Sequence, residues 1–378
     1  MKKQAIAVLF SLLPACAATP AEAAIRKARE EVAKRPAYSP SFNALAIAYL
    51  GRARETSDAA FLVKAEETLK RSFALAPDNY EGLKVQACVL LGRHEFAKAR
   101  ELSNKLNRLT PDDVMVYGYL ADANMELGNY KEAVDNVQWM LNLRPGNAPG
   151  LTRAASLREL HGDIEGAIDL TQRAYDASAY QEIEERAWLL TQMSRLNLAA
   201  GRLTEAETFA NGALGVFPDY QYALDALGRI RVTQKRYDEA VSLFRKRYDE
   251  APRAANLFAP AEALEQAGRH EEAARAFADF ERRAMEETDR ADNANRELAA
   301  YYTDYAHQPE KARQIAEREA GRRHDAFTLD AYAWSLAATG DFAHANSEMQ
   351  KALAFGLKDP KVLEHARIIA GQGVRSAL

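Results

Sequence analysis

The chain has 378 residues, of which 48% are hydrophobic, 28% charged and 9% aromatic. This composition is typical of a folded globular protein and excludes disordered, collagen-like and disulfide-rich classes. Fifty Lys and Arg residues against 54 Asp and Glu residues give a formal net charge of −4. The sequence carries no basic run, so it does not predict a nucleic-acid partner.

Residues 1–23 are expected to form an export signal. Lys2 and Lys3 precede an apolar run at 5–13, and small residues follow the run, which is the arrangement of a signal peptide. The apolar run is too short to span a bilayer. The rest of the sequence holds no apolar segment as long as a membrane helix, so the mature chain is expected to be exported and to lack a transmembrane helix.

Two routes of signal processing remain open. The small residues at 15–17 and at 21–23 both fit ordinary signal peptidase, which would release a periplasmic or secreted protein. The segment Leu13-Pro14-Ala15-Cys16 also resembles a bacterial lipobox, although proline is unusual there. In that case Cys16 would carry lipid, and the protein would be a membrane-anchored lipoprotein. The only other cysteine, Cys88, lies in an apolar run and is interpreted as a small helix residue.

A capping helix is expected next, at residues 24–36, and prolines then fall at a fixed period. Pro77, Pro111 and Pro145 are 34 residues apart, as are Pro218 and Pro252. A period of this length indicates a repeat array that forms one elongated domain. Small residues twelve positions apart recur within each period, even where the proline is missing. The pairs are Ala87 and Ala99, Ala121 and Ala133, Ala155 and Ala167, Ser194 and Ala206, Gly228 and Ala240, Ala261 and Ala273, Ala300 and Ala312, and Ala333 and Ala345.

A glycine turn separates the two small residues in five of these units. The glycine lies five residues before the second alanine and is followed by a polar residue. Glycine can take the left-handed conformation that ends a helix, and the polar residue can cap the next helix. Each unit is therefore expected to be a pair of antiparallel helices in close backbone contact. The glycines are Gly128, Gly162, Gly201, Gly268 and Gly340.

This pattern of small residues, glycine turn, alanine and proline at period 34 resembles the tetratricopeptide repeat (TPR). The resemblance implies an all-α fold, an α-solenoid in which about nine hairpins form a right-handed superhelix. Units 1–4 are expected at 37–179, units 5–9 at 180–358, and a C-terminal capping helix and tail at 359–378. The eighth unit is the poorest match, because His307-Gln308-Pro309 replaces the glycine turn. The units start near Ser39, Tyr80, Val114, Ala148, Ala187, Gln221, Ala254, Asn293 and Ala326.

The sequence carries no signature of catalysis or cofactor binding. It contains no glycine-rich phosphate loop, no GxSxG elbow, no HExxH and no EF-hand loop. Most of its histidines fall in turns, where they are expected to be solvent-exposed, and none of them pairs with another at metal-ligand spacing on one helix face. We therefore expect neither an enzyme nor a metal or cofactor site.

The resemblance implies that the first helix of each hairpin lines a concave groove. The residue after each first-helix small residue is then expected to face the groove. At this position Arg195 and Arg229 lie in adjacent units, with Arg153 in the unit before, and these guanidinium groups could converge on an anion. Alternatively, each arginine is solvated or paired internally, since Asp225 lies four residues before Arg229 on the same helix.

The C-terminal half of the groove is expected to be acidic and aromatic. Phe258, Glu262, Tyr301 and Trp334 share the groove-facing stripe. Exposed aromatic residues rimmed by charge are typical of protein interfaces. Aromatic residues at helical spacing also commonly pack between helices, and both interpretations of these side chains stay open.

The sequence thus favours a non-catalytic scaffold of the bacterial cell envelope that binds a protein partner in its groove. The alternative is a protein that binds an anionic non-protein ligand, such as an acidic polysaccharide, through Arg153, Arg195 and Arg229. A membrane contact is expected only through a lipid on Cys16. The sequence does not indicate the partner's identity or the oligomeric state.

Overall fold

The computed structural model describes residues 18–376, with side chains to residue 371, and this part of the chain is helical without strands. The helices are α1 (Pro20–Lys34), α2 (Ser39–Thr56), α3 (Ala60–Leu75), α4 (Tyr80–Gly92), α5 (Phe96–Leu109), α6 (Val114–Glu126), α7 (Tyr130–Leu143), α8 (Ala148–Leu160), α9 (Ile164–Ala177), α10 (Ile183–Ala199), α11 (Leu203–Val216), α12 (Gln221–Thr233), α13 (Tyr237–Glu250), α14 (Phe258–Gln266), α15 (His270–Met285), α16 (Asn295–Ala300), α17 (Pro309–Ala320), α18 (Ala326–Ala338), α19 (Phe342–Leu353) and α20 (Pro360–Ser376). A short 3₁₀ segment, η1 (Ala254–Leu257), precedes α14, and a π-helical segment, η2 (Tyr301–Tyr305), follows α16.

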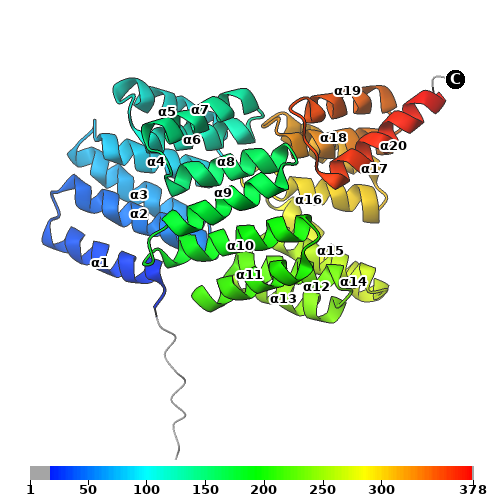
Figure 1. The fold of residues 1–378 in the computed structure, drawn as a ribbon, viewed down its shortest axis with the longest axis horizontal. Coiled ribbons are helices and arrows are strands. Elements are labelled where there is room, and N and C mark those ends of the chain that lie inside the picture. The colour runs from blue at the N-terminus through cyan, green and yellow to red at the C-terminus, as the bar shows by residue number, and fades with distance from the viewer. Residues whose placement is uncertain (1–17, 377–378) are drawn as a thin grey trace, which may run out of the picture.

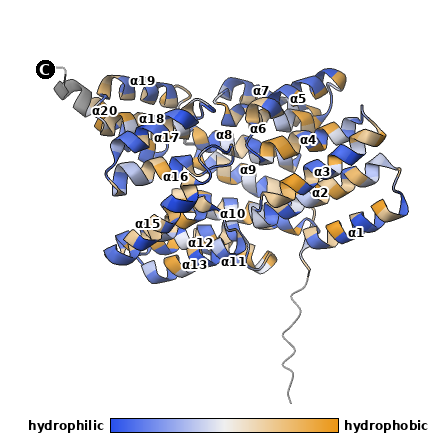
Figure 2. Ribbon diagram, turned by 180° about the vertical axis from the view of Figure 1, so that it is seen from behind, coloured by the Kyte–Doolittle hydropathy of each residue, from blue (hydrophilic) through white to orange (hydrophobic). Residues whose placement is uncertain are grey.

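Consecutive helices from α2 to α19 pair into stacked hairpins, with α1 and α20 at the two ends of the stack (Figure 1). The expected all-α solenoid is therefore confirmed. Both hydrophobic and hydrophilic residues occur along the helices, as Figure 2 shows, because each helix packs on its neighbours with one side and meets water with the other. The buried residues form a chain of local clusters along the stack, which is how hairpins that cannot bury their apolar faces alone acquire a shared core.

The small residues of the repeat lie where the two helices of a hairpin meet. The second alanine of every pair, from Ala99 to Ala345, is fully buried. On the first helices, Ala87, Ala121 and Ala333 are also fully buried. A larger side chain at these positions would separate the helix axes, so the spacing of twelve residues is a packing requirement.

The turns within the hairpins have the predicted left-handed backbone. The five repeat glycines have φ between +73° and +81°. Three other residues occupy the same turn position with a side chain, His94 (φ 58°), Lys235 (φ 59°) and His307 (φ 50°). A non-glycine residue in this region costs about 1–2 kcal/mol, so these three turns are held by the surrounding packing.

The eighth unit departs from the repeat through the π-helical segment η2. A π-turn adds one residue to a helix and shifts the register of everything after it. Accordingly Ala299, at 1% exposure, takes the buried position that the sequence pattern assigns to Ala300, which is only partly buried. The poor match of this unit to the repeat thus has a local structural cause.

The superhelix closes on itself through two sets of contacts between distant repeats. In the first seam, Arg54 and Ser57 at the end of α2 meet α10 and α12. The Arg54 Nε donates to the Glu184 Oε2 atom at 3.2 Å, and the Gln221 side-chain amide donates to the Ser57 hydroxyl. Tyr222 places its hydroxyl 3.4 Å from the same Ser57 oxygen.

The second seam joins the third and fourth hairpins to the last one. Phe355, after α19, packs its ring 4.6 Å from that of Tyr130 and 4.2 Å from that of His161, measured between centroids. The Lys358 amide donates to the Leu160 carbonyl at 3.3 Å, and the Arg323 guanidinium pairs with Glu126 at 3.2 Å. The inner surface of the solenoid is consequently bounded by repeats from both halves of the chain.

Candidate functional site

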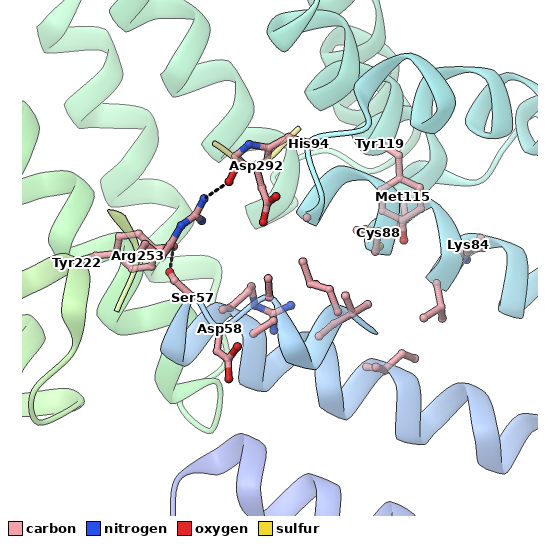
Figure 3. A pocket seen from close by; sticks show the side chains of 18 of the residues that line it. Ser57, Asp58, Lys84, Cys88, His94, Met115, Tyr119, Tyr222, Arg253 and Asp292 are labelled. Atoms are coloured by element: carbon pink, nitrogen blue, oxygen red, sulfur yellow. Dashed lines mark hydrogen bonds between the residues drawn. The ribbon is translucent and has the colours of Figure 1, made fainter. Parts of the chain in front are cut away.

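A cavity of about 550 Å³ lies on the inner surface of α2, α4 and α6, and we call it the apolar cavity. Its floor is made by apolar side chains of these first helices, and the first seam and the connections before η1 and α16 close its far end. Figure 3 shows Cys88, Met115 and Tyr119 at one end and Arg253, His94 and Asp292 at the other. The volume falls within the range of about 300–1,000 Å³ found for ligand pockets.

The apolar cavity does not contain an activated thiol. Cys88 and His94 both line it, but no hydrogen bond joins them in the described structure. Burial raises the pKa of the Cys88 thiol, which keeps the sulfur protonated and weakens it as a nucleophile. The arrangement therefore lacks the close pairing of nucleophile and base that cysteine hydrolases need.

A smaller cavity of about 180 Å³ adjoins the apolar cavity, and we call it the arginine cavity. The two cavities share Ser57, His94, Tyr222 and Arg253 in their linings. The helices α13 and α16 and the connections before η1 and α18 contribute four arginines to the smaller cavity, which also contains two glutamates. These charged residues are Arg247, Arg253, Arg296, Arg323, Glu297 and Glu319.

The pKa of His94 responds to its burial and to the charges of this region. Burial and the nearby guanidinium groups of Arg253, Arg323 and Arg296 lower its pKa from 6.5 to about 4. The imidazole is therefore neutral at physiological pH. The expectation that the histidines in turns are merely solvent-exposed is wrong for His94, because closure of the superhelix covers its turn with residues from later repeats.

Comparisons with known proteins identify the fold. No family model matches the sequence, and no curated protein sequence matches it. Among solved structures, the human IFIT1 dimer with PPP-AAAA is similar at a TM-score of 0.53 and 12% identity, over 88% of this chain and 95% of that chain. The Cut9 and Hcn1 hetero-tetramer of the APC/C matches at 0.53 and 12%, over 91% of this chain and 59% of that chain. A TPR protein of Thermus thermophilus matches at 0.44 and 20%, over 49% and 98%. This chain has the TPR fold.

Within the TPR fold, the three predicted groove arginines do not converge. Arg153 is only 17% exposed and makes a two-pronged pair with Asp122, at 2.7 Å from Nε and 2.5 Å from Nη2. It also donates to the Pro149 carbonyl at 2.9 Å. The Arg153 guanidinium is thus fully engaged in joining α8 to α6.

The other two arginines are also paired with carboxylates of the chain. Arg195 makes a two-pronged pair with Glu159 of the preceding hairpin, and Arg229 donates to Asp225 at 2.8 Å. The interpretation of converging guanidinium groups is therefore not supported, and internal pairing describes all three. The physical reason is that the carboxylates available on the same and adjacent first helices lie within reach of each arginine.

Phe258 and Tyr301 pack between helices of the TPR stack. Phe258 is only 9% exposed, and its ring lies 5.2 Å from that of Phe280. Tyr301 stacks on Phe277 with centroids 5.1 Å apart. Its predicted groove position is wrong because the π-turn at η2 shifts the register by one residue.

Glu262 and Trp334 are also engaged within the fold. Glu262 accepts a hydrogen bond of 3.0 Å from the Tyr305 hydroxyl, and its burial raises the pKa of its carboxyl group. The Trp334 indole stacks on the His365 imidazole of α20, with centroids 4.2 Å apart, and donates to Asp304 at 2.8 Å. Of the two interpretations of the aromatic stripe, packing is the one that describes Phe258, Tyr301 and Trp334.

Sequence reasoning missed the residues that do line the cavities. His94, Arg253 and Arg296 lie in or next to connections, whereas the sequence pattern predicts a groove along one stripe of the first helices. The periodic pattern gives the register of each hairpin but not the curvature that brings the second repeat against the seventh and eighth. For Arg253, directly after the repeat proline, the positive charge is the one sequence feature that could have indicated a place in a binding cavity.

The described residues were compared with the requirements of a metal site and of a membrane-spanning helix. Between residues 18 and 376, no group of three His, Cys, Asp or Glu side chains is placed to hold a metal ion. The same part of the chain contains no helix with the length and apolar character needed to cross a bilayer. Cys16 and most of the expected export signal lie outside the described residues.

Proposed function

We propose that this protein is a non-enzymatic scaffold of the bacterial cell envelope that binds a protein partner on the inner surface of its superhelix. The envelope location rests on the signal-like residues 1–23. The scaffold role rests on the TPR fold, which presents a long inner surface built from many hairpins.

The observation that carries the proposal is the apolar cavity with an exposed apolar side chain, that of Ile47, at its edge. Ile47, on α2, lines this cavity and is 55% exposed. Two further exposed apolar side chains, Ile183 and Phe327, line neighbouring hollows of the inner surface. A monomeric protein gains nothing from exposing such residues in a concave site, whereas a partner's apolar side chain would remove them from water at about 25 cal/mol per Å².

Charged residues at the edge of the cavity would orient the partner. Arg54, Asp58, Glu81 and Lys84 all line the cavity beside its apolar floor. An apolar centre with a polar rim is the usual anatomy of a protein interface. Because both signs of charge are present, the rim favours a partner segment that itself carries both.

The test uses a photo-crosslinking amino acid at Ile47 in the tagged protein, expressed in a bacterium that encodes it. We expect one envelope protein to be crosslinked, and we expect Ile47→Asp to abolish its co-purification. Val63→Asp on α3 is the matched control, because Val63 has a similar exposure of 47% and lines none of the inner cavities. If Ile47→Asp and Val63→Asp retain the same partner equally well, the partner does not bind in the apolar cavity.

A further inference from the structure

We propose that the arginine cavity is a binding site for an oxyanion, of phosphate or carboxylate chemistry. This inference does not depend on a protein partner, because the site is complete within the chain. It differs from the anionic site that the sequence suggested at Arg153, Arg195 and Arg229, whose guanidinium groups are already paired.

The guanidinium group of Arg253 is almost without partners. Its guanidinium makes one polar contact, a long one of 3.5 Å to the Asp292 carbonyl, and forms no ion pair with any described carboxylate. Arg253 is nevertheless half-buried and lines both cavities. Figure 3 shows its guanidinium group pointing toward Asp292. A guanidinium group has five N–H donors, so most of the donors of Arg253 remain available to a ligand.

Arg247 and Arg296 are also incompletely paired. Arg247 gives one nitrogen to Asp225 at 2.6 Å, but its Nε atom is buried without a hydrogen-bond partner. The carboxylate nearest to Arg296 is that of Asp325, at 3.8 Å, which is too long for a hydrogen bond. Arg296 is 42% exposed, whereas the Nε atom of Arg247 is buried. Leaving that buried donor unsatisfied is costly, and an oxyanion between these side chains would satisfy it together with donors of Arg296.

The acidic residues of the lining do not neutralise the cavity. The carboxylate of Glu319 is already hydrogen-bonded within the protein. It accepts from the side-chain amides of Asn293 at 2.9 Å and Asn295 at 3.0 Å, and it lies 3.9 Å from Arg323. Glu297 then remains as the one acidic group opposing Arg247, Arg253 and Arg296 in this lining. The low pKa of His94 agrees with a surplus of positive charge here.

The size and the neighbourhood of the cavity restrict the ligand. About 180 Å³ is less than most drug-sized molecules need, so the cavity fits a small anionic group rather than a whole nucleotide. Because the arginine cavity shares four lining residues with the apolar cavity, that group could be a free ion or the head of a molecule with an apolar tail. Both sources share the same chemistry at the arginines.

Titration calorimetry on the mature chain, at constant ionic strength with chloride as the replaced ion, tests the site. The probes are inorganic phosphate and octyl phosphate. We expect saturable binding of phosphate and a loss of about tenfold or more in affinity in the double variant Arg253→Gln and Arg296→Gln. A tighter fit of octyl phosphate would identify an amphiphile that reaches into the apolar cavity, whereas equal affinities would identify a free anion.

The matched control is Arg245→Gln with Arg275→Gln, which removes the same charge from exposed positions on α13 and α15 outside both cavities. We expect it to bind phosphate like the parent protein. Arg253→Lys, which keeps the charge and loses the planar fork, should fall between the two and serves if the double variant does not fold. Absence of saturable binding up to tens of millimolar phosphate, or equal affinity in the cavity variants and the control, would overturn the proposal.

Discussion

The hydroxyl of Tyr130 accepts a hydrogen bond of 2.7 Å from the backbone amide of Ala326, at the start of α18. The first amides of a helix have no partner within the helix, so a side chain from the third repeat satisfies one that the ninth repeat leaves open. We expect Tyr130→Phe to lower the free energy of unfolding by about 1 kcal/mol. Tyr237→Phe is the control, because Tyr237 has the same place in its repeat and its hydroxyl makes no hydrogen bond within residues 18–371. Equal effects of the two variants in urea denaturation would contradict this role of the second seam.

Substitutions at the turn position of the repeat are expected to raise the free energy of unfolding at one residue and to lower it at another. Lys235 has φ 59°, so Lys235→Gly should relieve backbone strain and raise the free energy of unfolding by about 0.5–1 kcal/mol. Gly201 has φ +76°, and no atom lies within 4 Å of the position that a Cβ would take there. Gly201→Ala therefore tests strain without a clash and should cost about 1 kcal/mol. Urea midpoints measure both changes, and a loss of stability in Lys235→Gly would show that its side chain contributes more than its backbone costs.

His94 should make stability depend on pH. Its pKa is about 4 in the folded chain against 6.5 as the ordinary value. Between these values the unfolded chain binds a proton that the folded chain does not, so the free energy of unfolding should fall as pH decreases from about 6.5 to 4. The loss should be about 2 kcal/mol, at 1.36 kcal/mol for each pKa unit less an allowance for partial exposure.

The comparison with His94→Asn isolates this effect from the carboxylates that titrate in the same range. Asn tolerates the left-handed backbone of the turn and does not titrate. We expect the free energy of unfolding of the parent, relative to that of the variant, to fall by about 2 kcal/mol as pH decreases from 6.5 to 4. Parallel pH curves would mean that His94 has the same pKa in the folded and the unfolded chain.

The contacts of the first helix allow a prediction of where the proposed export signal would be cleaved. Thr19 caps α1 through its side chain and donates to the buried Glu55 carboxylate at 2.6 Å, and the Ala21 amide donates to the same carboxylate at 2.9 Å. Cleavage after Ala23 would remove both contacts and the cap. We therefore expect intact mass to show a chain that begins at Cys16 or Ala18, and a chain truncated to Ala24 to be less stable by about 2 kcal/mol. A native mature chain beginning at Ala24 would contradict this prediction.

The regular part of the fold could be predicted from the sequence because it depends on local sterics. A small residue is needed where two helices touch, as at Ala133. A residue with left-handed backbone conformation is needed where the chain reverses between them, as at Gly128. Both requirements are therefore visible in the repeat. Tyr301 was misplaced because a single π-turn changes the register without changing the composition. The pairing of Arg195 with Glu159 was missed because it joins two hairpins, and only the packed structure shows that distance.

The two seams change how this solenoid should unfold. In an open repeat array each hairpin contacts only its neighbours, so the ends fray and unfolding spreads gradually from them. Here the first hairpin contacts the fifth and sixth, and the third and fourth contact the last. An end of the array cannot detach without breaking contacts in the middle, which couples distant hairpins into a single cooperative transition.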